Sequence, residues 1–375
     1  MERQNEARLE QVVRQLRGLY ESLGYTRFPM RRFEEYALYL ENKSFLKSES
    51  VLTFTNPDGK LMALKPDVTL SIVKHARTRR EGAEKVYYNE SVYRLAPTAR
   101  EFVEIEQMGV EYMGEVGRYA VGEVVRMAIE SLRAVSDDYV LDVSHMGFAG
   151  GLMEAAELRP EQKARLFALI RQKNAHELKR AVEEEGVAPF YAERIEQLAE
   201  LCGGFESTLE RAARIAVSNE MQQALTELRE LYGTLAAVGL ADRVRLDFSI
   251  LNDLDYYNGI VFQGYVRGVP RAVLAGGRYD NLMRKFGKAG DGIGFALYLD
   301  ELARLLADHR ALDVDALLLY RETDDLAKVN AAAFGMAKSG LRVLAVTERP
   351  AELRFAKEYA FDGEAFAEKG GDAVC

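Results

Sequence analysis

The feature that most constrains the fold is a long helix-forming segment, residues 150 to 238, with strand-forming sequence on both sides. The segment is rich in Ala, Leu, Glu and Arg, and its only prolines are Pro160 and Pro189. These residues favour helices, and short turns such as the one at 202–204 divide them. We therefore expect an all-helical insertion inside a domain that is built on a sheet.

Patterns outside the insertion predict a mixed fold. Apolar residues at helical spacing predict a helix over 4–23 that ends at Gly24. Asp67 is placed to cap a helix over 68–78. We expect strands at 51–54, 61–64, 86–94, 102–112, 243–248 and 256–265, and helices at 279–286 and 297–309. A strand at 316–320, a helix at 324–338 and a strand at 342–347 predict a small βαβ-like tail.

Composition and charge exclude several classes of function. The 375 residues carry 50 Lys and Arg against 59 Asp and Glu, a net charge of −9, which argues against a dominant phosphate-binding surface. Cys202 and Cys375 suggest no disulfide framework, and the four histidines are scattered, so we expect no metal site. No apolar run reaches the ~18 residues of a membrane span, and the N-terminus is polar. We expect a cytoplasmic protein that does not bind membranes.

Three residues on one predicted strand suggest a ligand site. Gln107, Gly109 and Glu111 alternate, so they share one face. A carboxylate, an amide and a glycine suit an amine-bearing ligand, because they offer a charge, directional hydrogen bonds and close approach. A solvent-facing edge of the sheet is an equally good interpretation of the sequence.

Two tyrosines, Tyr256 and Tyr257, precede Asn258-Gly259. One interpretation is a hairpin with a tight turn at Asn-Gly. The other is that a tyrosine hydroxyl orients a bound polar group. The sequence alone does not separate the two.

Two glycine-rich segments have different interpretations. Gly276-Gly277 predicts a tight turn into a helix, although backbone at such a turn can also approach a ligand closely. The glycines between 290 and 294 lack the strand–loop–helix context of a phosphate loop and a Walker lysine. We therefore exclude nucleotide binding through the second segment.

Six segments in one order resemble the catalytic core of histidyl-tRNA synthetases: LKPDVT (64–69), SVYR (91–94), EQMGVEYMG (106–114), DLDYYNGIVF (253–262), AGGRYDNL (275–282) and GIGFALYLDEL (292–302). The resemblance covers residues 1–305. It implies an α+β, class II synthetase-like fold, with an antiparallel sheet flanked by helices, a helical insertion and a homodimeric core. Residues 306–375 resemble a truncated anticodon-binding domain, so we do not expect tRNA binding.

The resemblance also implies a histidine pocket. Asp67, Thr69 and Glu111 match family residues that hold the α-amino group, and Gln107 matches one that positions the ligand. The motif with two tyrosines retains Asp255, Tyr256 and Tyr257, and Tyr279 matches an imidazole-facing tyrosine. We take Tyr257 and Tyr279 as the tyrosines that face the imidazole, although the register does not separate Tyr256 from Tyr257. The implied histidine-binding set is Asp67, Thr69, Gln107, Glu111, Tyr256, Tyr257 and Tyr279.

The residues that would activate the amino acid differ from the family. Asn252 and Glu301 stand where synthetases have arginines that contact the reacting carboxylate and the ATP phosphates. Ala96 replaces a glutamate after Arg94, and the loop that follows is acidic. Adenylyl transfer depends on positive charge placed at the phosphates. Each lost electrostatic contact costs roughly 3 kcal/mol of transition-state stabilisation. We therefore expect no catalytic residues and no cofactor.

A chain that keeps the amino-acid pocket without adenylation resembles the regulatory subunits of short-form ATP phosphoribosyltransferase. The resemblance implies a hetero-oligomer with the separate catalytic subunit, which carries out the first step of histidine biosynthesis. It implies that histidine is the effector and that catalysis belongs to the partner. The alternatives are a divergent histidyl-tRNA synthetase and a synthetase-like paralogue with another partner.

Overall fold

The chain divides into two compact units, Gln11–Arg304 and Met1–Glu10 with Leu305–Cys375. The structure is a computed structural model. It describes residues 2–40, 51–76, 82–95, 101–251, 256–306 and 312–369. Within these ranges, no helix is both long and apolar enough to cross a membrane.

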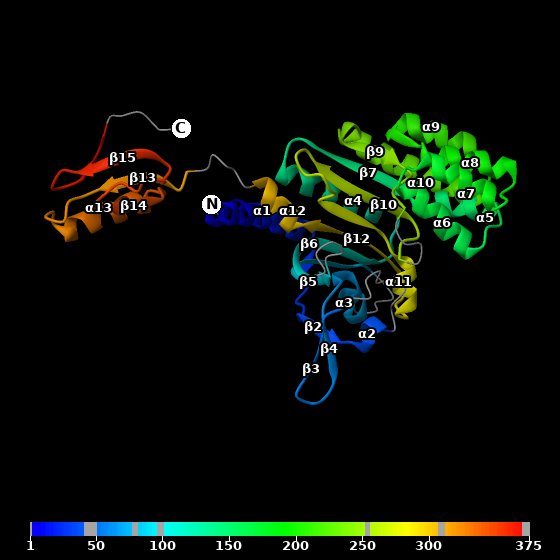
Figure 1. The fold of residues 1–375 in the computed structure, drawn as a ribbon, viewed down its shortest axis with the longest axis horizontal. Helices are drawn as coiled ribbons and strands as arrows, with labels where there is room; N and C mark the ends of the chain where they lie inside the picture. The colour runs from blue at the N-terminus through cyan, green and yellow to red at the C-terminus, as the bar shows by residue number, and fades with distance from the viewer. Residues whose placement is uncertain are drawn as a thin grey trace. The chain divides into compact units, whose positions relative to one another are not determined.

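A nine-stranded sheet forms the centre of the larger unit in the described residues (Figure 1). Strands β1 and β5 are parallel, as are β7 and β9, and the other neighbours are antiparallel. This confirms the expected α+β fold with a mainly antiparallel sheet. The strands in spatial order are β1 (Thr26–Arg27), β5 (Glu84–Leu95), β6 (Phe102–Gly114), β12 (Asp291–Tyr298), β11 (Leu274–Arg278), β10 (Ile260–Val266), β7 (Tyr139–His145), β9 (Val244–Asp247) and β8 (Cys202–Gly204).

Helix α1 (Glu2–Ser22) contacts α4 (Arg118–Val135) through Tyr20, and α4 covers one face of the sheet. The apolar residues of α4 recur at helical spacing, and Val124, Ile129 and Leu132 are fully buried. The Tyr20 hydroxyl on α1 lies 2.9 Å from the Ser131 hydroxyl on α4. This face of β6 and β12 is therefore filled by apolar packing.

The opposite face of β5 and β6 belongs to a second buried cluster. Helices α3 (Val68–His75) and α11 (Asp280–Lys285) contact each other, and α11 also contacts β12. Leu70 and Ile72 of α3 join Tyr88 of β5 and Leu282 of α11 in this cluster. Asp67 caps α3 through a hydrogen bond from the Leu70 N–H to its Oδ1, 2.9 Å long, as expected from the sequence.

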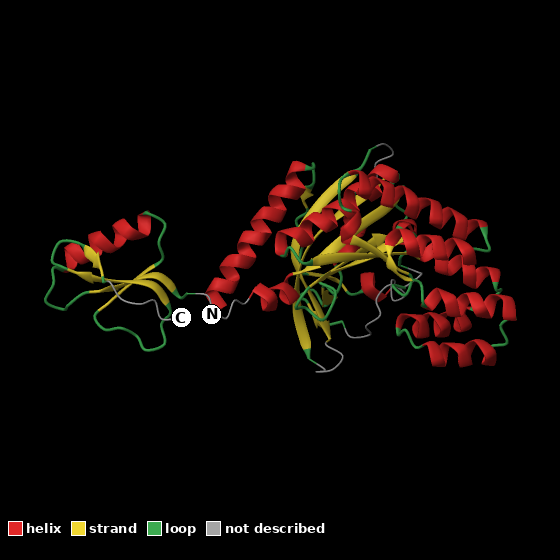
Figure 2. Ribbon diagram, turned by 90° about the horizontal axis from the view of Figure 1, so that it is seen from above, coloured by secondary structure: helices red, strands yellow, loops and turns green. Residues whose placement is uncertain are grey.

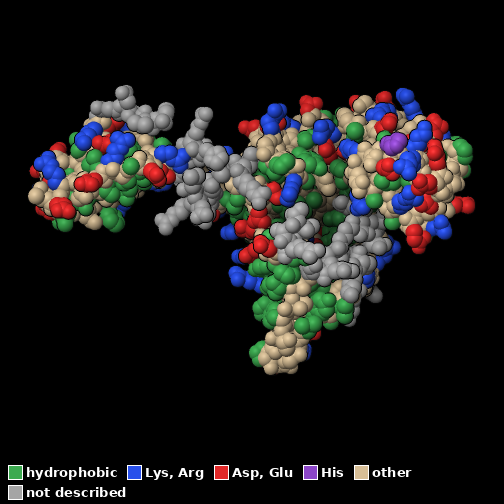
Figure 3. Space-filling model, viewed as in Figure 1, with side chains coloured by type: hydrophobic (Ala, Val, Ile, Leu, Met, Phe, Trp, Pro, Cys, Tyr) green, Lys and Arg blue, Asp and Glu red, His purple; other side chains and the backbone are tan. Residues whose placement is uncertain are grey.

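A three-stranded sheet of β2 (Phe33–Glu35), β4 (Leu61–Leu64) and β3 (Thr53–Thr55), with helix α2 (Ala37–Leu40), precedes α3. Hydrophobic side chains gather over this small sheet (Figure 3). Phe33, Phe54 and Leu61 are 45%, 38% and 47% exposed. The Phe33 and Phe54 rings meet edge to face, with centroids 5.5 Å apart.

The helical insertion lies beside the sheet (Figure 2), which confirms the prediction for 150–238. The turn predicted at 202–204 is wrong in part, because these residues form strand β8 and pair with β9. The helices of this segment are α5 (Met146–Ala155), α6 (Pro160–Arg171), α7 (Ala175–Glu184), α8 (Pro189–Ala199), α9 (Phe205–Ile215) and α10 (Asn219–Ala237).

Three other local predictions differ from the structure. Gly276 and Gly277 lie inside β11 rather than in a turn, because neighbouring strands leave no room for a side chain. A Cβ on Gly276 would lie 2.4 Å from the Gly294 carbonyl oxygen. The strand predicted from 256 begins only at Ile260, and Tyr256 is in a turn. The predicted helix 297–309 is confirmed over α12 (Leu299–Leu306), although 297 and 298 belong to β12, and 307–309 lie outside the described residues.

The smaller unit contains a four-stranded sheet in the order β14-β13-β15-β16. Strand β13 (Val314–Leu319), helix α13 (Leu326–Lys338) and strand β14 (Val343–Val346) form the expected βαβ unit, because β13 and β14 are parallel. The sequence analysis missed β15 (Phe355–Phe361) and β16 (Phe366–Glu368).

Candidate functional site

A buried carboxylate lies at the centre of the site. Glu111 belongs to β6, between Val86 of β5 and Gly294 of β12, and is 1% exposed. Gln107 is on the same face of the strand and is 3% exposed. The interpretation of these residues as a solvent-facing edge is therefore wrong, because β6 has a neighbour on each side.

Two hydroxyl groups hold the Glu111 carboxylate. The Thr69 hydroxyl donates to Oε1 at 2.6 Å, and the Tyr279 hydroxyl donates to Oε2 at 2.7 Å. Thr69 lies in the first turn of α3, next to the cap residue Asp67, and Tyr279 immediately precedes α11. Three segments far apart in sequence thus meet at one carboxyl group.

Burial dominates the electrostatics of Glu111. The pKa of its carboxyl group is raised to about 8, mainly by loss of water and in smaller part by the nearby Asp67 carboxylate. The hydrogen bonds from Thr69 and Tyr279 lower this pKa, but they do not offset the burial. An ammonium group that entered the site would compensate the buried negative charge. The arrangement therefore suits a cationic ligand.

The tyrosines predicted for the site pack against one another. The Tyr256 and Tyr257 rings have centroids 4.6 Å apart, and the Tyr256 and Tyr279 rings meet edge to face at 6.4 Å. Tyr256 and Tyr279 are 8% and 2% exposed. Burial raises the pKa of all three phenols, so the hydroxyl groups stay protonated and can donate hydrogen bonds.

Two glycines of β12 make room for this arrangement. A Cβ on Gly294 would lie 1.8 Å from the Glu111 Oε2 atom, and a Cβ on Gly292 would lie 2.1 Å from the Tyr279 ring. From the sequence, the glycines at 290–294 were compared only with a phosphate loop, and their role beside Glu111 and Tyr279 was not expected. Their alternation along a strand was the available signal, since alternate residues share one face.

Gln107 and Arg94 mark the side of the site away from Glu111. Gln107 is four residues from Glu111 along β6, which is about 13 Å, and it lies opposite Tyr298 of β12. The Arg94 Nε atom donates to the Pro66 carbonyl oxygen at 2.7 Å, and its Nη2 atom is 3.6 Å from Asp67 Oδ2. Arg94 is therefore turned toward the loop before α3.

The region next to α12 is acidic. The Glu301 carboxylate forms an ion pair with Arg271 at 3.6 Å, and Asp300 accepts a hydrogen bond from the Glu106 N–H at 3.2 Å. Burial and the charges of Asp300 and Glu104 raise the pKa of the Glu106 carboxyl group. The substituted positions Asn252 and Ala96, and also Asp255, lie outside the described residues.

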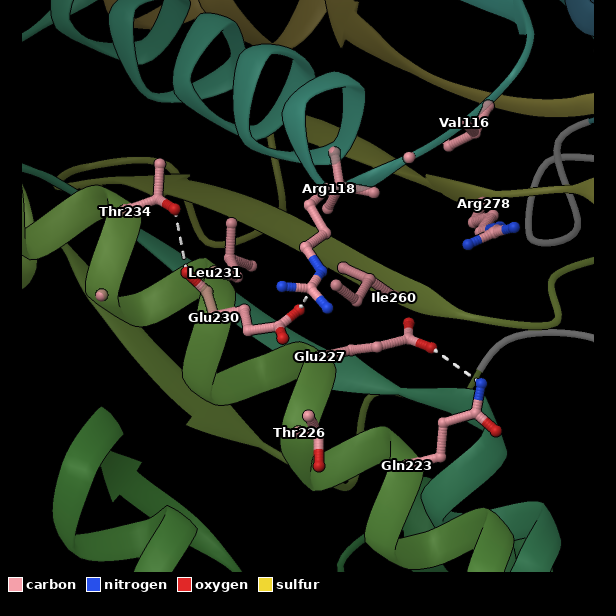
Figure 4. Close-up of a pocket in the computed structure, with 13 residues that line it drawn as sticks. Val116, Arg118, Gln223, Thr226, Glu227, Glu230, Leu231, Thr234, Ile260 and Arg278 are labelled. Carbon is pink, nitrogen blue, oxygen red and sulfur yellow. Dashed lines mark hydrogen bonds and ion pairs between the residues drawn. The ribbon is translucent and has the colours of Figure 1, made fainter.

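A second candidate site is a cavity of about 650 Å³ that opens between the N-terminus of α4 and helix α10 (Figure 4). Arg118 forms an ion pair with Glu230 at 3.0 Å across it. Glu227 lies 3.2 Å from the buried His145 ring and is also bonded to Gln223. The sequence analysis singled out none of these residues for a site. Among the described residues, no group of three or more His, Cys, Asp and Glu could hold a metal ion.

Comparisons with known proteins identify the family to which this chain belongs. The model of the family described as histidyl-tRNA synthetase matches residues 1–302. An ATP phosphoribosyltransferase regulatory subunit from Moorella thermoacetica is 32% identical over 301 residues, which cover 79% of this chain and 77% of the relative. One from Geobacter metallireducens is 31% identical over 322 residues, or 83% of this chain and 73% of the relative.

Solved structures agree on the fold. A Bacillus halodurans protein, titled an ATP phosphoribosyltransferase regulatory subunit/histidyl-tRNA synthetase, matches with a TM-score of 0.76 at 24% identity, covering 92% of this chain and 90% of that one. A chain of the ATP phosphoribosyl transferase (HisG:HisZ) complex from Thermotoga maritima matches with a TM-score of 0.61 at 19% identity, covering 77% and 96%. With its sequence relatives and the family model, the chain belongs to the histidyl-tRNA synthetase-like family and, within it, to the ATP phosphoribosyltransferase regulatory subunits.

Proposed function

We propose that this chain is the regulatory subunit of a short-form ATP phosphoribosyltransferase and that histidine is its effector. The phosphoribosyl transfer takes place in a separate catalytic subunit, with which the chain assembles in the cytoplasm. One observation carries the choice of effector. Glu111 is a buried carboxyl group with two hydroxyl donors, and one of them, Tyr279, belongs to a group of three tyrosines that pack together.

The ligand is an amino acid in this proposal. Its ammonium group binds at Glu111 and Thr69, near Asp67, and replaces the water that the carboxyl group has lost. Tyr257 and Tyr279 face the imidazole, and Gln107 binds the part of the ligand that lies away from Glu111. Neutral phenols can accept or donate a hydrogen bond to an imidazole nitrogen. The packed rings thus offer both apolar contact and polar orientation.

Regulation follows from differential binding. Histidine shifts the complex toward an inhibited state only to the extent that it binds that state more tightly. Linkage makes this coupling reciprocal. If histidine favours one assembly state by a given factor, that state binds histidine more tightly by the same factor. The site itself therefore needs no catalytic group.

The experiment that tests this function is a phosphoribosyltransferase assay on the catalytic subunit, with and without this protein, at increasing histidine concentrations. We expect strong activation by this chain and its reversal by histidine. Activation without an effect of histidine would reject the effector and retain the regulatory subunit. No activation would reject the regulatory role.

The purified chain is expected to catalyse no histidine-dependent exchange between ATP and pyrophosphate. Adenylation needs cationic groups on the phosphates, whereas Glu301 brings a negative charge and Arg94 is bonded to the Pro66 carbonyl oxygen. The measurement is radioactive pyrophosphate exchange, with an authentic histidyl-tRNA synthetase as the positive control. Exchange above the level without enzyme would favour a divergent synthetase.

The chain is also expected to form a homodimer through the small sheet of β2, β3 and β4. Its exposed aromatic and aliphatic side chains suit a self-complementary, two-fold interface. Phe33→Glu should convert a dimer, with twice the chain mass of 42.1 kDa, into a monomer. Phe334→Glu is the matched control, because Phe334 is 62% exposed but lies on α13. Light scattering after gel filtration gives the mass, and a dimeric F33E variant would exclude this surface.

A further inference from the structure

A buried carboxylate joins the two segments that supply the tyrosines of the site. Asp280 is the first residue of α11 and is 6% exposed. Its Oδ1 atom accepts a hydrogen bond from the Gly292 N–H at 3.2 Å. Its Oδ2 atom accepts from the Asn258 Nδ2 atom at 2.9 Å and from the Arg278 Nε atom at 2.8 Å. One side chain thus contacts β12, the end of β11 and the loop before β10.

The bond between Asp280 and Asn258 is reciprocal. The Asp280 N–H donates to the Asn258 Oδ1 atom at 2.9 Å, and the Asn258 N–H donates to the Arg278 carbonyl oxygen at 3.1 Å. Asn258 directly follows Tyr257, and Asp280 directly follows Tyr279. The Tyr279 N–H donates to the Gly292 carbonyl oxygen at 2.7 Å. The relative positions of the tyrosines are therefore set by a network in which their own side chains take no part.

This network continues to the other face of the sheet. Arg278 is the last residue of β11 and lines the second cavity beside α4, whereas Tyr279, which follows the strand, bonds to Glu111. The Arg278 Nη2 atom donates to the Asp291 Oδ2 atom at 2.8 Å, and Arg278 lines the second cavity, with Glu227 and Ile260 (Figure 4). Asp280 is therefore bonded both to the tyrosine segments and to a residue that is reached from the cavity.

We propose that Asp280 is a positioning residue for ligand binding. It holds Tyr279 and the Tyr256–Tyr257 pair in register through Asn258, Gly292 and Arg278, without touching the ligand. This inference rests on the proposed function and deepens it, since it states which group sets the geometry of the histidine site. Preorganised supporting hydrogen bonds of this kind determine how well a site matches its ligand.

The first test is Asp280→Asn. An amide nitrogen in place of Oδ2 is a hydrogen-bond donor and cannot accept. The Asn258 Nδ2 and Arg278 Nε groups therefore lose their acceptor. We expect the dissociation constant of histidine, measured by calorimetry, to rise at least tenfold. Asp142→Asn is the matched control, because Asp142 is also nearly buried and pairs with Arg245 at 2.8 and 3.1 Å, away from the tyrosines. The control should lose stability but not affinity.

A rescue variant separates positioning from general destabilisation. Asn258→Asp combined with Asp280→Asn exchanges the acceptor and the donor of the reciprocal pair. The acid at 258 then accepts from both the amide and the backbone N–H at 280, and the amide oxygen still accepts from Gly292. We expect the double variant to recover the part of the affinity that D280N loses through Asn258, but not the part due to Arg278, because the Arg278 Nε atom still faces an amide nitrogen. A double variant as weak as D280N, or weaker, would count against the reciprocal pair as the cause.

Arg278→Met provides a test if D280N does not fold. It removes one donor to Asp280 from the cavity side, and we expect a threefold to tenfold rise of the dissociation constant. Arg118→Met, which lines the same cavity but pairs with Glu230, should have no effect. Unchanged histidine affinity in both D280N and R278M would overturn the proposal.

Hydrogen–deuterium exchange keeps the two proposals distinguishable, because it needs no ligand. In D280N, peptides that contain residues 256–260 and 278–283 should exchange faster than in the wild type, and in D142N they should not. If wild-type protein fails to bind histidine, the effector proposal fails, and the exchange comparison still decides the role of Asp280. Equal exchange in D280N and wild type would reject that role.

Discussion

Glu111→Gln is expected to raise the dissociation constant of histidine by about a hundredfold and to abolish histidine feedback, while activation of the catalytic subunit is retained. Glutamine keeps the shape of the side chain and an acceptor for one hydroxyl donor, but it carries no charge. Removing one partner of a buried charged pair costs about 3 kcal/mol or more, which corresponds to about two orders of magnitude in affinity. Glu111→Ala should also lose feedback and leave the complex assembled.

The control for this prediction is Glu227→Gln. Glu227 is a partly buried carboxylate bonded to His145, but it lines the second cavity and contacts none of the tyrosines of the site. Calorimetry gives the affinity, and the phosphoribosyltransferase assay gives the feedback. Full inhibition of the E111Q complex by histidine would show that the effector binds elsewhere.

The stability of E111Q gives an independent check of the same electrostatics. Because burial raises the pKa of Glu111 from 4.5 to about 8, the folded protein favours the neutral acid. Ionisation therefore destabilises the free protein as the pH rises above 4.5, and the loss is complete above pH 8, at roughly 5 kcal/mol for this shift. E111Q has no such loss. Its melting temperature should exceed that of the wild type at pH 9 and match it at pH 4.

The sequence was most informative about helices and their caps. Asp67 caps α3 as expected, and the insertion is helical, because capping residues and helical periodicity act within a few residues. The polar face of Gln107 and Glu111 was ambiguous for a physical reason. Whether β6 is an edge strand depends on β12, and β12 lies some 180 residues later in the chain.

The glycines of β11 and β12 also have roles that depend on residues distant in the sequence. Gly-Gly is a strong local signal for a turn, yet Gly276 and Gly277 are in a strand because rings and carbonyl groups from neighbouring strands fill the space. Gly294 is required by Glu111, which is distant in sequence. Asp280 and Asn258 were likewise missed, since each is an ordinary cap or turn residue until the two segments meet.

Histidine binding is expected to release close to one proton at pH 7. Burial raises the pKa of the Glu111 carboxyl group to about 8, so the free protein holds this proton at neutral pH. The ammonium group of the ligand favours the carboxylate and lowers the pKa, and the proton leaves. The affinity should therefore rise with pH by up to about tenfold per unit below pH 8, and flatten above it.

Calorimetry in buffers of different ionisation enthalpy measures this proton directly. The imidazole of histidine, with an ordinary pKa near 6.5, contributes its own smaller proton change, and E111Q isolates it because the variant has no carboxyl group to titrate. The difference between wild type and E111Q in protons released is thus the contribution of Glu111. An equal release in both proteins would mean that Glu111 is already ionised in the free site. In that case Thr69, Tyr279 and water together would stabilise the carboxylate in the free protein. The ammonium group would then bind a carboxylate that is already ionised, without releasing its proton.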